Sequence, residues 1–290
     1  MLSSAPQYLV SGLTVGATYG LTALGFTMIF NTTGIINFAQ GEFVMLGGML
    51  SVAFLKAHAP LPLAVLLAVS VAALAGCLME RLVIRPVGRA PAVNLVIITI
   101  GVSILMRGAV MLAWGKDTFS LPAFTSAKPL AVLGAVVRPQ SLWVLSITLL
   151  ILAGLKLFFS RSIHGKAMLA CSCEPKAAAL VGISVDRMAM LSFGLSGFLG
   201  AVGGAILAPI TLTSYDVGVM LGLKGFAACI LGGLGNPFGA AAGGLILGVL
   251  ESFGASVASG YQDAFAFVML LALLFLKPTG LFGAPGSDRV

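Results

Sequence analysis

Charged residues are scarce in this sequence. Only 9% of its 290 residues are Asp, Glu, Lys or Arg, whereas 59% are hydrophobic, and the mean hydropathy is +1.10. A soluble globular protein has about 25% charged residues. So few charges cannot cover a surface that faces water. The composition therefore excludes an ordinary soluble domain and predicts an all-α, polytopic helical membrane protein, with residues 1–290 as a single transmembrane domain.

Metal ligands and catalytic motifs are also scarce. The chain has two histidines and four cysteines, and the C-x-C of Cys171 and Cys173 lacks the further ligands that a zinc site needs. It contains no G-x-x-x-x-G-K-[ST] phosphate loop, no H-E-x-x-H and no G-x-S-x-G. We therefore expect no metal, no cofactor and no enzymatic activity, including ATP hydrolysis. The net charge of +7 indicates basic membrane loops rather than a nucleic-acid partner.

Long apolar runs predict the membrane spans. About 20 apolar residues are needed for a helix to cross the hydrocarbon core, and this rule gives eight or nine crossings. The second, seventh and ninth candidates could be broken or re-entrant. The candidates are residues 8–30, 35–55, 61–82, 92–114, 142–159, 188–211, 219–234, 238–257 and 264–276.

Basic residues in the loops predict the orientation, because cytoplasmic loops are enriched in Lys and Arg. Two loops qualify, one after the third span and one around the fifth-to-sixth connection. Loop 115–140 should then face outward, and Lys277 places the C-terminus inside. Nine crossings put the N-terminus outside, and eight put it inside. The basic residues of the two loops are Arg81, Arg85, Arg89, Lys156, Arg161, Lys166, Lys176 and Arg187.

Glycines recur every four residues in two predicted spans. Small residues at this spacing let helix backbones approach closely in lipid, where no hydrophobic force drives association. Two interpretations stay open, helix packing inside the bundle and an interface with another membrane subunit. The glycines are Gly12, Gly16 and Gly20 in the first span, with Gly239, Gly243, Gly244 and Gly248 in the eighth.

The stretch INFAQGE, residues 36–42, places polar groups between apolar runs. An unpaired carboxylate in lipid costs about 3 kcal/mol or more, so Glu42 must be capped, paired, protonated or hydrated. The pattern indicates that one helix stops here and another starts, as at many transport sites. Either the segment shapes a translocation path or it is a structural cap at a tight turn. The candidate pathway residues are Asn37, Phe38, Gln40, Gly41 and Glu42.

Arg107, Lys224 and Glu251 are further ionisable residues inside the predicted spans. Such residues are rare in membranes and are functional candidates by default. The two cations could extend toward the membrane surface or pair with Glu42 or Glu251, and the sequence does not assign the pairs. A salt bridge or an interface is favoured over contact with substrate.

A short helix is predicted in the basic loop, within a cytoplasmic segment of about residues 160–187. The stretch CEPKAAALVGI covers residues 173–183. Ser172 or Cys173 can cap its N-terminus, Pro175 suits the first turn and Gly182 suits the end. The helix is too short to cross a membrane. It could dock on a soluble partner, or lie at the membrane surface without one.

Three stretches together resemble the permeases of the branched-chain amino acid ABC transporter family. INFAQGEFVMLGG is similar to the family's I-N-F-A-x-G-E signature, and CEPKAAALVGISVDRM to its D-P-x-A-A-x-x-x-G-I-x-V-x-R segment. GLKGFAACILGGLGNPFGAAAGGLILGVLES is similar to its late K-x-F-x-A-x-x-L-G-G segment. The three run in order from about Gly12 to Ser252. The short N-terminus resembles the LivH-type subunit more than its LivM-type partner.

This resemblance implies a multi-pass permease of the bacterial inner membrane that imports branched-chain or other aliphatic amino acids. It implies a second, LivM-like permease, two ATP-binding cassette subunits and a periplasmic substrate-binding protein. Urea or short amides are alternative cargo, and a stand-alone secondary transporter or channel is the competing class.

The resemblance also implies that residues 174–183 form the coupling helix that inserts into an ATPase groove. Glu174 stands where the family more often has Asp, and Gln40 where it often has His. The residues implied in coupling are Glu174, Pro175, Ala177, Ala178, Leu180, Gly182 and Ile183.

Overall fold

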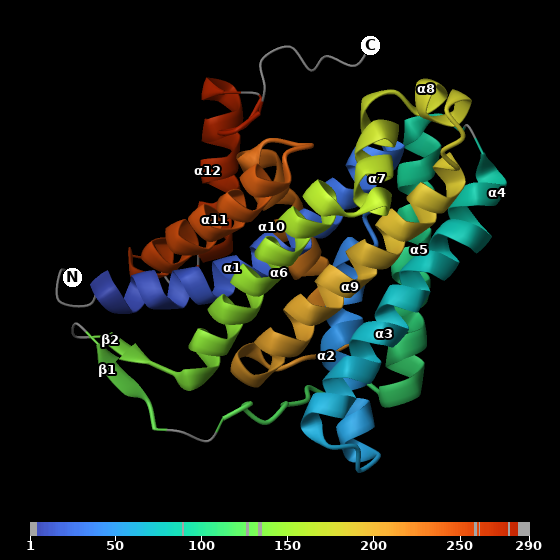
Figure 1. The fold of residues 1–290 in the computed structure, drawn as a ribbon. Coiled ribbons are helices and arrows are strands. Elements are labelled where there is room, and N and C mark those ends of the chain that lie inside the picture. Colours follow the sequence, from blue (N-terminus) through green and yellow to red (C-terminus); the bar gives the residue numbers. More distant parts are fainter. Residues whose placement is uncertain are drawn as a thin grey trace.

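The computed structural model describes residues 5–88, 90–125, 128–132, 135–257, 260, 262–277 and 279–283, so Arg89 of the basic loop lies outside the described residues. Within these ranges the chain is almost entirely helical, which confirms the predicted fold class (Figure 1). Five membrane-length helices are α1 (Ala5–Thr33), α5 (Ala92–Trp114), α6 (Pro139–Arg161), α9 (Val185–Thr211) and α11 (Pro237–Val257). A sixth is composite: α3 (Leu61–Met79) continues through the π-helical turn η2 (Glu80–Ile84) into α4 (Arg85–Val87).

Three shorter apolar helices complete the candidate spans. They are α2 (Gln40–Lys56), α10 (Val217–Gly232) and α12 (Gln262–Leu276). With 17, 16 and 15 residues, they are shorter than the 20 or so that a straight crossing requires. These are the second, seventh and ninth candidates, the same three for which the sequence indicates broken or re-entrant helices.

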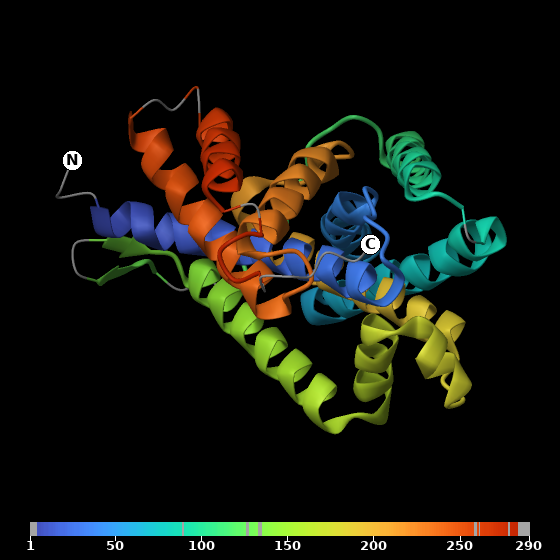
Figure 2. The ribbon, with the colours of Figure 1, turned by 90° about the horizontal axis from the view of Figure 1, so that it is seen from above.

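Helices α1 and α9 form the centre of the bundle. In their most apolar windows 83% and 78% of the residues are buried, against 22% for α5 and 11% for α6. Figure 2 shows α5 and α6 at opposite edges of the molecule. Their exposed Ile, Leu and Val side chains give the bundle an apolar flank suited to lipid. The inner helices α1, α2, α9, α10 and α11 carry many of the buried polar residues described below, and α5 adds a polar stripe from the edge.

Most of the repeated glycines lie between α1 and α11, which pack along one another in opposite directions (Figure 1). A Cβ on Gly12 would lie 2.6 Å from Val249 Cα, and one on Gly16 would lie 2.7 Å from the Gly244 carbonyl oxygen. Gly20 faces Ala241 in the same way, while Gly248 faces Gly12 and Gly16. Gly239 and Gly243 pack instead against Gly232 and Ala228 of α10.

The two ends of the bundle carry different structures (Figure 1). At one end lie α7 (Ile163–Cys173), α8 (Pro175–Leu180) and the η2–α4 turn. At the other end, strands β1 (Leu130–Val132) and β2 (Ala135–Val137) form an antiparallel hairpin that the sequence did not predict. Phe119 and Thr213 form a further bridge at this end, between the α5–α6 and α9–α10 connections.

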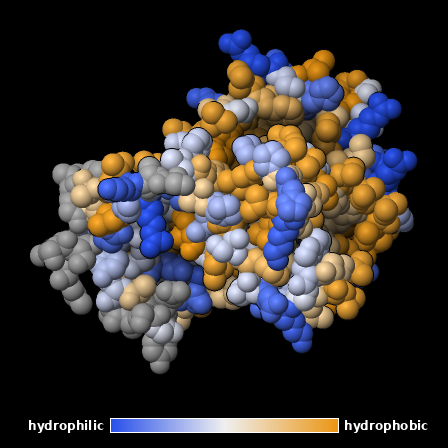
Figure 3. Space-filling model, turned by 90° about the horizontal axis from the view of Figure 1, so that it is seen from below, coloured by the Kyte–Doolittle hydropathy of each residue, from blue (hydrophilic) through white to orange (hydrophobic). Residues whose placement is uncertain are grey.

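The face seen in Figure 3 is mainly apolar on its right-hand side, with hydrophilic side chains at the rim, across the middle and on the left. Inside the bundle, buried hydroxyl groups of α1 are satisfied within their own helix. Thr22, Thr27 and Thr32 of α1 each donate to the carbonyl oxygen four residues earlier. Such bonds satisfy the hydroxyl within its own helix, so these side chains can be buried without a partner from another element.

Candidate functional site

The INFAQGE segment begins in an irregular connection that passes through the protein interior. Helix α1 ends at Thr33, Gly34 takes a left-handed conformation with φ of 70°, and α2 begins at Gln40. Asn37, Ala39 and Gln40 are each fully buried. Non-helical backbone at membrane depth is tolerated only where protein or a cavity surrounds it. Here the surrounding protein is α1, α5, α9 and α10.

Asn37 and Gln40 satisfy much of this irregular backbone. Asn37 Oδ1 accepts a 3.0 Å hydrogen bond from Ala39 N, and the Asn37 carbonyl accepts one from Gln40 N. Gln40 Nε2 donates to the Ser196 carbonyl at 3.2 Å, and the single hydroxyl proton of Ser196 has two acceptors within reach, Gln40 Oε1 and the Gly25 carbonyl. The Gln40–Ser196 pair thus connects the start of α2 with α9 and α1.

Glu42 is buried and is held by α5. Ser103 Oγ donates a 2.8 Å hydrogen bond to Glu42 Oε1, and Arg107 Nε lies 3.7 Å from the same oxygen. One turn earlier on α5, Thr99 Oγ1 accepts a 3.1 Å bond from Phe38 N. Thr99, Ser103 and Arg107 are spaced four residues apart, so they form one polar stripe on an otherwise apolar helix.

The start of α2 also lies directly against α10. A Cβ on Gly41 would collide with the Gly218 carbonyl and would lie 2.7 Å from Gly222 Cα. The Phe38 ring packs on Phe226 of α10, with their centroids 5.4 Å apart. Within the described part of the chain, Glu42 Oε2 has no hydrogen-bond partner, and it faces Gly218. The structure therefore brings all five predicted pathway residues into one buried junction of α2, α5, α9 and α10.

In the structure, the ionisable residues predicted inside the spans form two separate ion pairs. Arg107 faces Glu42, whereas Lys224 of α10 faces Glu251 of α11, with 2.7 Å between Nζ and Oε1. Lys224 Nζ also lies 2.6 Å from Asp263 Oδ1 of α12 and donates to the Tyr19 hydroxyl of α1 at 3.2 Å. We call these four residues, Tyr19, Lys224, Glu251 and Asp263, the Lys224 cluster.

The predicted coupling segment forms a helical hairpin of α7 and α8. Pro175 opens α8, and Gly182 takes a left-handed φ of 88° two residues after its end. The capping prediction was wrong, because the N-cap of α8 is Glu174 and neither Ser172 nor Cys173. The Glu174 carboxylate accepts a hydrogen bond from Lys176 N.

One side of α8 is buried and the other is exposed. Ala178 is buried against Met168 and Cys171 of α7 and Met188 of α9, with Ile183 packed beside them. Leu180 is 88% exposed and the following Val181 is 77% exposed. These two adjacent side chains form an exposed apolar edge on α8. Burial also raises the pKa of the Cys171 thiol.

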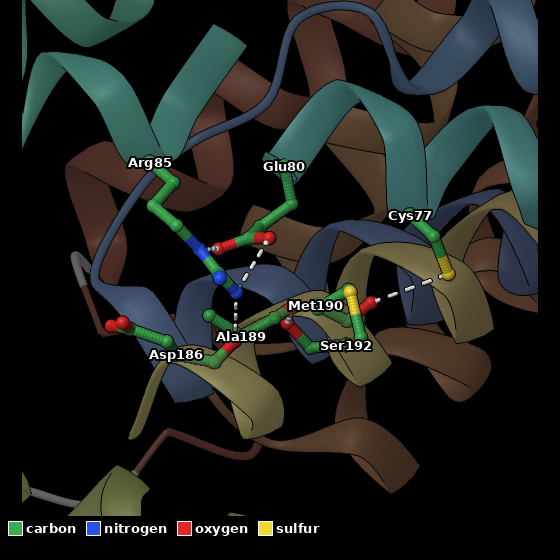
Figure 4. A network of polar contacts seen from close by, with 7 residues as sticks. All are labelled: Cys77, Glu80, Arg85, Asp186, Ala189, Met190 and Ser192. Atoms are coloured by element: carbon green, nitrogen blue, oxygen red, sulfur yellow. Dashed lines mark hydrogen bonds and ion pairs between the residues drawn. The ribbon is translucent and has the colours of Figure 1, made fainter. Parts of the chain in front are cut away.

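A clasp of polar contacts ties the end of α3 to the start of α9 (Figure 4). In the π-turn η2, Arg85 N donates a hydrogen bond to the Glu80 carbonyl oxygen five residues earlier. This bond places the side chains of Glu80 and Arg85 next to each other. Arg85 Nε and its terminal Nη2 atom donate to the two oxygens of the buried Glu80 carboxylate at 3.1 and 3.2 Å. The same Nη2 atom donates to the Asp186 carbonyl of α9. We call these contacts the Arg85 clasp.

Several residues of these sites are not among the candidates predicted from the sequence. Thr99 and Ser103 were detectable as a polar stripe with Arg107 in an apolar span. Ser196, Tyr19 and Asp263 gave no comparable signal, because their importance comes from residues more than a hundred positions away or on neighbouring helices.

Known permeases are similar to this chain over most of its length. Residues 8–274 match the family model described as branched-chain amino acid transport system / permease component. The high-affinity branched-chain amino acid transport system permease protein BraD of Pseudomonas aeruginosa is 35% identical, over 98% of this chain and 97% of its own length. The corresponding LivH protein of Escherichia coli is 32% identical over the same shares.

A second kind of permease and a solved structure are also similar to this chain. The autoinducer 2 import system permease protein LsrC of Enterobacter is 32% identical over 88% of this chain and 74% of its own length. The solved structure of PsaBC from Streptococcus pneumoniae in complex with Fab aligns with a TM-score of 0.54 and 14% identity, covering 94% of this chain and 92% of that one, which is a likeness of fold alone. From the family model and from relatives that match along nearly the full length, the chain belongs to the family of branched-chain amino acid transport system permease components.

Proposed function

We propose that this chain is the membrane-spanning permease subunit of an ABC importer that carries branched-chain amino acids across the bacterial inner membrane. The observation that carries the proposal is the match over 98% of the chain to permeases named for this cargo. The apolar interior agrees with it, because an aliphatic solute needs few polar contacts along its path. Urea or a short amide is the alternative cargo.

The partners in this proposal are two ATP-binding cassette subunits, a periplasmic substrate-binding protein and a second, LivM-like permease. The sequence lacks a phosphate-binding loop, so the ATPase activity would belong to separate subunits. The exposed Leu180–Val181 edge of α8 lies at the basic end of the bundle and suits an ATPase groove. The apolar flanks of α5 and α6 leave room for a second permease as well as lipid.

The coupling mechanism follows from how α8 is attached. Ala178 fixes α8 to Met168 of α7 and Met188 of α9, and α9 packs against α1, α2 and α3 in the centre of the bundle. A displacement of α8 when the ATPases close would therefore move α9 as well. The Arg85 clasp extends this connection from α9 to α3. We infer that α8, α9 and α3 move together between inward-open and outward-open states.

The INFAQGE junction is proposed as part of the translocation path. Its backbone is irregular, its polar atoms are buried, and it joins α2 to α5, α9 and α10. Any relative motion of α9 and α10 must therefore change its contacts. A purely structural turn would have the same bonds, so variants of Glu42 must be tested for transport as well as for stability.

The experiment is ATP-dependent uptake of labelled leucine, with urea in parallel, into proteoliposomes that contain all the proposed subunits. Leucine uptake that requires ATP and the binding protein would support the proposal. Urea uptake alone would retain the importer and change the cargo. Uptake driven by an ion gradient without ATPase subunits would support a secondary transporter and contradict the proposal.

A further inference from the structure

A cavity of about 310 Å³ lies between α1, α9, α10 and α11. Lys224 and Glu251 line it together with Tyr19, so the Lys224 cluster forms one part of its wall. Most of the remaining wall is apolar. Known small-molecule sites are typically concave, about 300–1,000 Å³ in volume and mostly apolar with a few placed polar groups. The apolar lining residues are Val15, Leu207, Val217, Leu221 and Ala255.

The cavity lies toward the end of the bundle that carries the β1–β2 hairpin. Its residues come from the first halves of α1 and α10 and from the second halves of α9 and α11. In the predicted orientation this is the external half of the membrane. A solute released by an external binding protein would therefore reach this cavity before it reaches the cytoplasmic half.

The charges around the cavity do not balance. One cation, Lys224, faces the two carboxylates of Glu251 and Asp263, which leaves one negative charge in excess. Glu251 is about nine-tenths buried, and within the described residues its Oε2 atom has no hydrogen-bond partner. A buried acceptor without a donor destabilises the folded protein. A ligand that brings a cationic N–H group to Oε2 would remove this penalty.

We propose that this cavity is a transit site for an aliphatic α-amino acid in its zwitterionic form, an assignment that rests on the proposed function. The α-ammonium group donates to Glu251, and the carboxylate lies against Lys224 and the Tyr19 hydroxyl. The side chain lies on Val217, Leu221 and Leu207. A zwitterion can insert between Lys224 and Glu251 without a change in net charge, so both ions keep an opposite partner during passage.

A structural role for the Lys224 cluster is the competing explanation, because the same contacts tie α12 to α10 and α11. That role needs the charges but not the empty space beside them. A variant that fills the cavity and leaves the charges in place therefore separates the two explanations. Leu221→Trp does this, and Leu223→Trp is the matched control because Leu223 lies on the same helix, is 38% exposed and does not line the cavity.

The experiment compares these variants in the full importer in proteoliposomes. With Leu221→Trp we expect leucine uptake to fall at least about tenfold while ATP hydrolysis stimulated by the loaded binding protein persists. Leu223→Trp should transport within about twofold of the parent. Undiminished leucine uptake by Leu221→Trp would overturn the transit site while leaving the proposed function intact. A parent complex that does not transport leucine would overturn both.

A second measurement does not depend on transport. Ser252 lines the cavity, so Ser252→Cys can be labelled from outside with a membrane-impermeant thiol reagent, with the parent chain as background. Leucine should slow this labelling at least threefold, and 4-methylpentanoate, which lacks the ammonium group, should not. Equal protection by both compounds would remove the role given to Glu251. No protection by leucine would overturn the site.

Discussion

Ser103 of α5 donates a 2.8 Å hydrogen bond to the buried carboxylate of Glu42, the third residue of α2. Helix α5 is peripheral, and it meets the bundle through this polar stripe and through apolar side chains such as Leu95 and Val110. The position of Glu42 near a helix N-terminus favours its negative charge. The Glu42 carboxylate thus holds the peripheral helix α5 to the bundle, and it places a negative charge inside the buried, irregular junction at the start of α2.

Replacement of Ser103 by alanine should destabilise the protein by about 1–3 kcal/mol, because it leaves a buried carboxylate oxygen with only the longer contact to Arg107. Ser70→Ala is the control, since Ser70 is exposed and bonds only within α3. We expect its effect to stay within about 0.5 kcal/mol. The measurement is the thermal unfolding midpoint of the purified permease in detergent. Equal midpoints for the two variants would contradict the anchoring role of Glu42.

Gly204→Ala should separate α2 from α9. A Cβ at this position would collide with the Val44 carbonyl, which is backbone and cannot move aside alone. Overpacking of this kind costs about 1–3 kcal/mol. Gly101 of α5 has open space around its Cβ position, so Gly101→Ala should be neutral or stabilise by up to about 1 kcal/mol. A midpoint for Gly204→Ala that stays at the parent value would show that the α2–α9 crossing tolerates a methyl group.

Much of the helical layout was predictable, because apolar length is a local property of the sequence. The second span illustrates the limit. Ile35, Ile36 and Phe38 extend its apolar run, yet α2 begins only at Gln40. The left-handed Gly34 and the bond from Ala39 N to Asn37 keep the intervening backbone out of a helix. This irregular backbone is tolerated because neighbouring helices bury it. The sequence alone does not reveal which helices those are.

The candidate site was predictable as a set of residues but not as a set of contacts. Glu42 and Arg107 are both unusual for a membrane span, and so are Lys224 and Glu251. Their pairing depends on which helices are adjacent, and the sequence permitted either anion for either cation. Asp263 near the start of α12 completes the Lys224 cluster. Its role follows only from the placement of α12 beside α10 and α11.

The two thiols of α7 should differ in reactivity toward maleimide. Cys173 is exposed, whereas Cys171 is buried and burial raises the pKa of its thiol. Because the thiolate is the reactive form, less of Cys171 is reactive at neutral pH, and its labelling rate should keep rising above the usual thiol pKa of about 8.5. Mass spectrometry of inside-out vesicles between pH 6.5 and 9.5 measures both rates. Similar rates at pH 7 would indicate that the α7–α8 hairpin is open.

Leu180→Ser should weaken binding of the ATPase subunits without loss of fold. Leu180 is 88% exposed on α8, so its removal takes little from the permease itself but removes an apolar contact from the proposed docking edge. Ile163→Ser is the matched control, because Ile163 is 78% exposed at the start of α7. Co-purification of tagged permease with the ATPases measures the effect. A similar yield of ATPase with both variants would argue against docking through α8.

The Arg85 clasp should matter for coupling more than for folding. Arg85→Lys keeps the positive charge but cannot bind both oxygens of Glu80 and reach the Asp186 carbonyl at the same time. If α3 and α9 move together through this contact, leucine uptake should fall several-fold while stimulated ATP hydrolysis stays within about twofold of the parent. The ratio of leucine molecules transported to ATP hydrolysed is therefore the quantity to measure. Arg81→Lys is the control, since Arg81 is exposed on the same π-turn. A parallel loss of uptake and hydrolysis would point to a structural role for the clasp, and parent-like rates of both would show that α8 moves the bundle without it.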